Sequence, residues 1–312
     1  MAIVRDDFQP VSEFTVHTAA ALQGTLVICT RNRAAMLRRC LEGVRSLLQM
    51  PYEVLIIDNS NGDEETRTLA DEFGFRYLIE AAPGLSRARN RGLAEAQGEI
   101  VAFLDDDAVP QPEWFGYLLS AFEDPQLGAA SGRIVIPQMD EGASHSEVPR
   151  MLDKQNPKWL EIASFGGMGL GSNMALRRNA SRGKKLFDER LGRGGPFQIG
   201  EEHYAFAYLI SLGYSVRYIP EAIVFHPPLR RDPIEVEARN SIAYFLLLLA
   251  EFPSQRLNML KFLLRRLRGK RLQWTRDSQE TGDLMTSSLG VKCRAACSGL
   301  WVFIKTPHPT KR

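Results

Sequence analysis

The sequence predicts an α/β protein with a mostly parallel central sheet flanked by helices, followed by a helical extension at the C-terminal end. In the first third of the chain, runs of β-branched and aliphatic residues alternate with segments of helical periodicity, which implies crossover connections between parallel strands. From residue 234 to residue 268, Leu and Phe recur in stripes typical of one or two helices. With 312 residues and 44% hydrophobic content, the chain can bury a large core.

Strand-like and helix-like segments follow one another through the first part of the chain. The predicted strands are 25–29, 54–57, 75–79 and 100–104, and the predicted helices are 36–47, 66–73 and 85–96. Residues 58–62 have the composition of a turn. Ligands bind beyond the carboxyl ends of the strands in such sheets, so we expect the polar residues that follow these strands to form one site.

The pattern changes after about residue 140. Residues 139–157 are polar and lack clear periodicity, so we expect a loop or an insertion there. A helix is predicted at 204–212, and two short strands are predicted at 216–219 and 222–225, joined at Pro220 and Glu221. The predicted organisation is an N-terminal extension (1–24), an α/β domain (25–233) and a basic helical extension (234–312).

The net charge of +2 hides an asymmetry between two parts of the chain. Residues 253–312 hold 13 of the 39 basic residues but only 3 of the 37 acidic residues, which leaves 26 basic and 34 acidic residues in the rest. An acidic body with a basic tail suits a protein that works near anionic lipid or another anionic surface. No nucleic-acid partner is expected, because no aromatic-basic platform for single strands is visible.

Two interpretations of the basic tail remain open. Residues 244–249 and 260–264 supply apolar side chains, and Lys and Arg crowd the turns that follow. Either two helices pack on the domain and leave a solvated basic end, or they make an in-plane contact with an anionic membrane. The longest apolar stretch, residues 242–250, is far shorter than the roughly 20 residues that span a bilayer. With no signal segment at its start, the protein is expected to be cytoplasmic and peripheral at the inner face of the membrane.

Three consecutive carboxylates, Asp105, Asp106 and Asp107, follow the predicted strand at 100–104. Like charges this close raise one another's pKa unless a cation or hydrogen-bond donors offset them. One carboxylate can hold ligand hydroxyls while another holds a divalent metal bound to a diphosphate, since Mg2+ and Mn2+ favour oxygen ligands. The alternative is a solvated acidic turn.

Three further groups of residues have a chemical and a structural interpretation. The segment 84–92 places Arg87, Arg89 and Arg91 in the first turns of a helix, which favours an anion or is simply a solvated basic face. The pair Glu201-Glu202 precedes an amphipathic helix and is either a general base of raised pKa or a helix N-terminal acid cluster. His226, between a strand and two prolines, is a candidate metal ligand or a structural histidine.

Taken together, these motifs resemble those of a family 2 glycosyltransferase with a GT-A fold. The matching segments occur in order at 27–33, 57–60, 84–92, 104–107, 171–175 and 200–202, and the resemblance extends from about Thr25 to His226. It implies a Rossmann-like half that binds the nucleotide and a second half that binds the acceptor. It says little about residues 1–24 or about the chain after residue 235.

The resemblance also implies a role for each matching residue. Contacts with the nucleotide sugar fall to Thr30, Arg31, Arg33, Asp58, Arg89, Asn90, Asp105 and Asp106, of which Asp58 contacts the base. Asp107 and His226 are the implied ligands of Mn2+ or Mg2+, and Gly171 and Asn173 lie on the acceptor and sugar side. The implied reaction is one inverting displacement, from a nucleotide-diphosphate sugar to a hydroxyl of a glycan or lipid-linked saccharide.

The catalytic base is where this chain departs from the family pattern. Many relatives have Glu-Asp where this chain has Glu201-Glu202. The second residue is usually catalytic, so Glu202 inherits the role. Its extra methylene leaves open whether Glu201 takes over.

Two other functions compete with glycosyl transfer. A nucleotidyltransferase also places acids at strand ends, but it requires a Gly-rich phosphate loop after the first strand, and residues 30–33 contain no glycine. A non-catalytic nucleotide-sugar-binding protein of the same fold is the second alternative. The presence of Asp105, Asp107, Glu202 and His226 argues against such a loss of activity.

Overall fold

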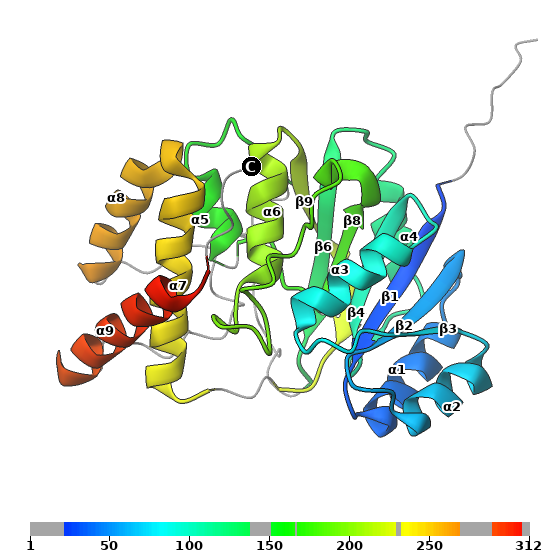
Figure 1. Cartoon of the computed structure of the whole chain (residues 1–312). Coiled ribbons are helices and arrows are strands. Elements are labelled where there is room, and N and C mark those ends of the chain that lie inside the picture. The colour runs from blue at the N-terminus through cyan, green and yellow to red at the C-terminus, as the bar shows by residue number, and fades with distance from the viewer. Residues whose placement is uncertain (1–21, 138–150, 166, 229–231, 269–288, 308–312) are drawn as a thin grey trace, which may run out of the picture.

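One mixed sheet organises the molecule. The structure is a computed structural model, and it describes residues 22–137, 151–165, 167–228, 232–268 and 289–307. In this part of the chain, nine strands form a sheet in the order β3-β2-β1-β4-β8-β6-β9-β5, with β7 pairing to β9. Most paired residues belong to parallel pairings, and helices pack along the sheet (Figure 1). The predicted α/β fold with a mostly parallel central sheet is confirmed.

The four parallel strands at one end of the sheet follow the predicted alternation. The strands β1 (Gly24–Thr30), β2 (Glu53–Asp58), β3 (Arg76–Ile79) and β4 (Ile100–Asp105) are joined by the helices α1 (Ala34–Arg45), α2 (Glu64–Phe73) and α3 (Leu85–Glu95). Each element lies within a few residues of its predicted position. The register pairs Thr30 with Asp58 and Cys29 with Asp105, so these strand ends lie at the same edge of the sheet.

Each face of the sheet carries its own hydrophobic core, because successive strand residues point to opposite faces. On one face, Leu26 and Ile28 pack with buried residues of α1, α2 and α4 (Trp114–Ala121). On the other face, Val27 and Ile57 pack with buried residues of α3, α5 (Trp159–Ser164) and α6 (Glu201–Ser211). The strand ends are therefore held between two helical layers.

Several elements of the second half were not predicted. β5 (Val109–Pro110), β6 (Leu127–Val135) and β8 (Asn173–Arg177) are short or rich in small residues, and η1 (Arg178–Ser181) is a single 3-10 turn. β8 lies between β4 and β6 and runs antiparallel to both. It carries the motif at 171–175 into the centre of the sheet.

The structure corrects two predictions in this half. The strands expected at 216–219 and 222–225 form one strand, β9 (Ser215–Phe225), whose pairing with β6 shifts register between Gly132 and Arg133. A bulge of this kind accommodates Pro220, which has no N–H to donate. The loop expected at 139–157 is wrong at Met151–Leu152, which form β7 against β9, while residues 138–150 lie outside the described part.

The C-terminal helices are an integral part of one core. α7 (Ile234–Glu251), η2 (Pro253–Gln255) and α8 (Arg256–Leu267) confirm the helices predicted at 234–268, and α9 (Leu289–Lys305) follows. Tyr244, Leu247 and Leu248 of α7 are buried together with residues of α6, so the expected membrane contact of residues 244–249 is wrong at these positions. The domain boundary at residue 234 stays a prediction. None of the described helices is long and apolar enough to span a membrane.

Candidate active site

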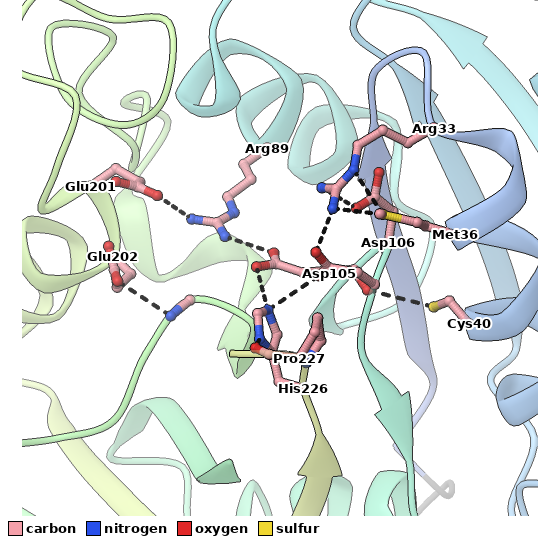
Figure 2. A network of polar contacts seen from close by, with 12 residues as sticks. Arg33, Met36, Cys40, Arg89, Asp105, Asp106, Glu201, Glu202, His226 and Pro227 are labelled. Atoms are coloured by element: carbon pink, nitrogen blue, oxygen red, sulfur yellow. Dashed lines mark hydrogen bonds and ion pairs between the residues drawn. The ribbon is translucent and has the colours of Figure 1, made fainter. Parts of the chain in front are cut away.

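Polar side chains from both halves of the sheet converge at the carboxyl ends of β1 and β4 (Figure 2). Asp106 is 3% exposed and lies at the centre of this edge. Its carboxylate accepts hydrogen bonds of 2.7 Å from Thr30 Oγ1 and of 2.7 Å from Arg33 Nη1. Burial raises the pKa of Asp106 to about 6. Asp106 therefore ties the loop after β1 to the acidic triplet, and its predicted contact with the donor stays a prediction.

A candidate metal group is formed by Asp105, Asp107 and His226, whose ligand atoms all lie within 4.8 Å of one another. The Nε2 atom of His226 lies 3.1 Å from Asp107 Oδ1 and 4.0 Å from Asp105 Oδ2. His226 follows β9 directly, and the pairing of Phe225 with Val109 in β5 brings it beside the triplet. The pairing of β5, which follows the triplet, with β9, which precedes His226, thus completes the group.

The orientation of the His226 ring suits a metal ligand. Its Nδ1 lies 2.6 Å from the carbonyl oxygen of Pro227, which can only accept, so Nδ1 carries a proton and Nε2 faces the carboxylates. Although burial opposes the charge on both groups, their contact raises the pKa of His226 and, with Arg33, lowers the pKa of Asp107 to about 2. Two carboxylates and an imidazole form a plausible donor set for a divalent cation.

Arg89 of α3 links the metal group to the carboxylate pair. The side chain is 2% exposed, and it donates to Glu201 Oε1 at 2.8 Å and to Asp105 Oδ1 at 3.3 Å. A Cβ atom at Gly171 would lie 2.7 Å from the Arg89 guanidinium, which explains the need for glycine there. Arg87 and Arg91 instead pair with Glu189 and Glu95, so of these three arginines Arg89 alone joins the network drawn in Figure 2.

The two adjacent glutamates differ in environment. Glu201 is buried, and burial together with the neighbouring Glu202 raises its pKa to about 8 against the attraction of Arg89. Glu202 is half-buried, and it accepts a long hydrogen bond of 3.4 Å from the Gly171 N–H. Burial would raise the pKa of Glu202, but the charges of His203 and Arg89 lower it. The oxygens of Glu202 are therefore less tightly held than those of Glu201.

The structure gives the surroundings of three residues that were expected to contact the nucleotide: Asp58, Asn90 and Arg31. The Asp58 carboxylate accepts from the Ser60 and Asp63 N–H groups and from the Tyr77 hydroxyl, at 2.9, 2.8 and 2.6 Å. The side-chain amide of Asn90 pairs with both backbone groups of Phe187. These side chains hold loops in place, and Arg31 is exposed after β1. Their contacts with a nucleotide stay predictions.

The side-chain amide of Asn173 likewise makes its hydrogen bonds within the protein. It is 0% exposed, accepts from Trp114 Nε1 at 2.8 Å and donates to the carbonyls of Arg133 and Ala222. It fastens β8 to β6 and β9, and the position of Gly171 and Asn173 on the acceptor and sugar side stays a prediction.

Sequence reasoning missed the role of Asn59. Its amide donates to the carbonyls of Glu80 and Ala82 and accepts from the N–H of Gly84 at 2.8 Å, so it shapes the loop that leads into α3 and Arg89. The residue was part of a recognised motif at 57–60. Nothing in the sequence indicated which distant backbone groups it would contact.

The comparison with protein families follows the same motifs. A model described as glycosyl transferase family 2 matches residues 25–182, about half of the chain. The chain belongs to glycosyl transferase family 2. The family predicted from the motifs is thereby confirmed.

Individual relatives are distant. Glycosyltransferase AglE of Haloferax volcanii is 26% identical over 211 residues, which cover 65% of this chain and 66% of that protein. Glucosyl-dolichyl phosphate glucuronosyltransferase of the same organism is 28% identical over 187 residues, which cover 55% of this chain and 58% of that protein. The matched part of the chain thus spans less than two thirds of the length of these relatives.

Among solved structures, the mannosyltransferase PcManGT from Pyrobaculum calidifontis, in complex with GDP-Man and Mn2+, has a TM-score of 0.54 and 15% identity. The likeness covers 92% of this chain and 77% of that one. At this identity it shows a shared fold, and it supports the GT-A architecture that the motifs predicted.

Proposed function

We propose that this protein transfers a sugar from a nucleoside-diphosphate sugar to a hydroxyl of a saccharide or lipid-linked saccharide, with inversion and with the help of a divalent cation. The observation that carries this proposal is the bridge made by Arg89 between Asp105 and Glu201. One side chain joins the candidate metal group to the carboxylate pair. Groups suited to an anionic leaving group and to a hydroxyl nucleophile are therefore neighbours, as one displacement at the anomeric carbon requires.

The donor side of the reaction falls to the acidic triplet and its cations. Asp105, Asp107 and His226 would hold Mn2+ or Mg2+, and the imidazole nitrogen, a softer ligand than oxygen, favours Mn2+ of the two. The bound ion would supply positive charge to the departing diphosphate. Arg33, paired with Asp106 and Asp107 at the same edge, offers a further cationic group to the phosphates. The Mn2+ and GDP-Man in the structure of PcManGT support this assignment.

The acceptor side falls to Glu202. It takes the proton of the acceptor hydroxyl while that oxygen attacks the anomeric carbon from the face opposite the diphosphate. The bond from the anomeric carbon to the diphosphate oxygen breaks with its electron pair on that oxygen, so a single step inverts the configuration. No covalent glycosyl-enzyme is needed. Glu201, held by Arg89, positions the guanidinium and does not act as the base.

The acceptor class rests on the relatives and on the tail. The Haloferax volcanii relative is named as a glucuronosyltransferase of glucosyl-dolichyl phosphate, which supports a lipid-linked saccharide as one acceptor class. Such an acceptor would place the enzyme at a membrane surface. The predicted contact of the basic C-terminal helices with anionic lipid is part of this proposal.

Thermal stabilisation by a panel of nucleotide sugars tests the proposal and names the donor. A donor present at about 100 times its dissociation constant stabilises the native state by ~2.7 kcal/mol, and Mn2+ should be required for the full effect. Failure of every nucleotide sugar to raise the melting temperature would contradict the proposal. Stabilisation without any sugar transfer would indicate a binding protein, and pyrophosphate release from a nucleoside triphosphate would indicate a nucleotidyltransferase.

A further inference from the structure

Helix α8 exposes an apolar stripe that the core does not use. Leu257, Leu260 and Leu264 are 64%, 46% and 53% exposed, and their spacing of three and four residues places them on one face. On the opposite face, Met259 and Phe262 are buried, and the Phe262 ring stacks on Phe165 at 4.7 Å. A surface helix that serves only the core buries one stripe and turns a polar face outward. α8 is apolar on both faces.

Helix α9 repeats this arrangement. Leu300, Trp301 and Ile304 are 47%, 62% and 66% exposed, whereas Ala295 is buried on the other face. A Cβ atom at Gly299 would lie 2.8 Å from Ile242, so this inner face packs closely on α7. Two successive helices thus each turn three large apolar side chains away from the core. Scattered apolar residues are normal on a protein surface, but grouped ones mark an interaction site.

Basic residues predominate along these two helices. Neither α8 nor α9 contains Asp or Glu, whereas their sequences include Arg256, Lys261, Arg265, Arg266, Lys292, Arg294 and Lys305. Arg265 and Arg294 are taken up by ion pairs with Glu161 and Glu235. Lys261, Arg268 and Lys305 are exposed beside the apolar residues. Each helix therefore presents an exposed apolar stripe with basic residues next to it, and these two stripes are the exposed surface of α8 and α9.

We propose that this surface of α8 and α9 lies in the interface of an anionic lipid bilayer. Leu and Ile side chains would insert below the headgroups, Trp301 would sit at the headgroup level that tryptophan favours, and the basic residues would meet anionic headgroups. A second copy of the chain is a poorer occupant, because it would bring the basic residues of two copies together. Of the membrane contact considered for residues 244–249 and 260–264, the inference keeps the second segment, where Leu260 and Leu264 are exposed, and drops the first, which the core buries.

The position of this surface relates it to the proposed active site. Figure 1 shows α7, α8 and α9 together at the end of the molecule remote from α1 and α2. The ring of Tyr244 in α7 packs where a Cβ atom of Gly200 would lie, directly before Glu201, while Ile242 packs on Gly299 of α9. One helix thus connects the carboxylate pair to the lipid-facing helix. Delivery of a lipid-linked acceptor, the purpose of this contact, rests on the proposed function, whereas binding to lipid is measured independently of sugar transfer.

Co-sedimentation with vesicles tests the inference. The full chain should bind vesicles of phosphatidylcholine with phosphatidylglycerol and should bind pure phosphatidylcholine weakly. Its affinity for the anionic vesicles should fall steeply as salt is added. The double variant Leu264→Glu/Trp301→Glu should bind anionic vesicles about tenfold more weakly or worse. Lys261→Glu/Arg268→Glu, which leaves the apolar residues in place, should reduce both the affinity and its dependence on salt.

A matched control variant introduces two glutamates at exposed apolar residues far from α8 and α9 in the sequence. Leu48 and Tyr52 are 75% and 56% exposed near the start of β2, and Leu48→Glu/Tyr52→Glu should bind vesicles much more strongly than Leu264→Glu/Trp301→Glu. Melting temperatures near that of the parent show that the variants fold. Glu202→Gln should bind vesicles as the parent does, so a failure of the proposed sugar transfer is separable from a failure of docking.

Three results would overturn the inference. The first is absence of binding by the parent at low salt, or equal binding to neutral and anionic vesicles. The second is an equal loss in the control variant. The third is a dimer in lipid-free solution that Leu264→Glu/Trp301→Glu dissociates, which would assign the surface to a second copy of the chain.

Discussion

Asp107 is the residue on which the role of a cation depends most directly. Its carboxylate lies 3.1 Å from His226 within the group that also contains Asp105. Asp107→Ala should abolish turnover and weaken nucleotide-sugar binding only when Mn2+ is present, because the acid acts through the cation. Calorimetric titration of the donor with and without Mn2+ measures this. Near-normal activity of the variant in Mn2+ would exclude the assignment of Asp107 as a metal ligand. EDTA should abolish the activity of the parent protein.

Glu202 provides a second prediction at this scale. Glu202→Gln should lower kcat by about 10²–10⁴ and leave donor binding nearly intact, since the group acts on the acceptor in the transition state. Glu201→Gln serves as the matched control, because it changes the same chemical group one position away. A larger loss of kcat in Glu201→Gln than in Glu202→Gln would show that Glu201 is the base and that Glu202 is not.

The pH dependence of kcat distinguishes the same two residues without mutation. The pKa of Glu202 is lowered from its ordinary value of 4.5, so this base is lost only as the pH falls through that acidic range. With donor and Mn2+ saturating, kcat should therefore stay level from about pH 9 to about pH 6. The pKa of Glu201 is about 8, so a base at Glu201 would lose activity as the pH falls through 8.

Single residues also show where sequence reasoning ends. The motifs assigned Asp107 and His226 to a metal and Asp105 to the nucleotide sugar, and the structure places all three side chains together, while their roles stay predictions. The motifs did not reveal that the polar groups of Asn90 and Asn173 are satisfied by distant backbone. A motif match gives a position in the fold, whereas hydrogen-bond partners depend on segments far away in the chain.

At the scale of elements, the loop before β8 supports the active site through Gly171. A Cβ atom at this position would lie 2.7 Å from the Arg89 guanidinium. Gly171→Ala should displace that side chain and lower kcat/KM by about tenfold or more, since small misplacements of catalytic groups are costly. Gly116→Ala within α4 is the control: its Cβ would meet only the end of the Gln49 side chain, at 3.0 Å. If both variants keep full activity, Arg89 does not need its present position.

Elements were predictable from sequence where the hydrophobic period was strong and local. The strands β1 to β4 and the helices between them met that condition, and each was found near its expected position. β8 was missed because five residues that follow a Gly-rich stretch carry little periodic signal. β9 was divided wrongly because Pro220 resembled a break, whereas the pairing with β6 continues past it with a shift in register.

At the scale of the whole molecule, the structure shows where the acidic and basic residues behind the charge asymmetry lie. The carboxylates of the candidate active site lie at the sheet edge, and basic residues of the tail lie next to the apolar stripes of α8 and α9. Composition alone predicted an anionic partner, but it could not separate the buried face of α7 from exposed faces. That distinction requires the packing of α7 on α6 and α9.

The central claim is that the metal group and Glu202 together perform an inverting sugar transfer. The most direct test is to follow nucleoside-diphosphate release and the anomeric configuration of the glycosylated acceptor in the same reaction. The account predicts one diphosphate released for each sugar transferred, an anomeric configuration opposite to that of the donor, and loss of both with EDTA or in Glu202→Gln. A product that retains the donor's configuration, or transfer at the parental rate in Glu202→Gln, would contradict it.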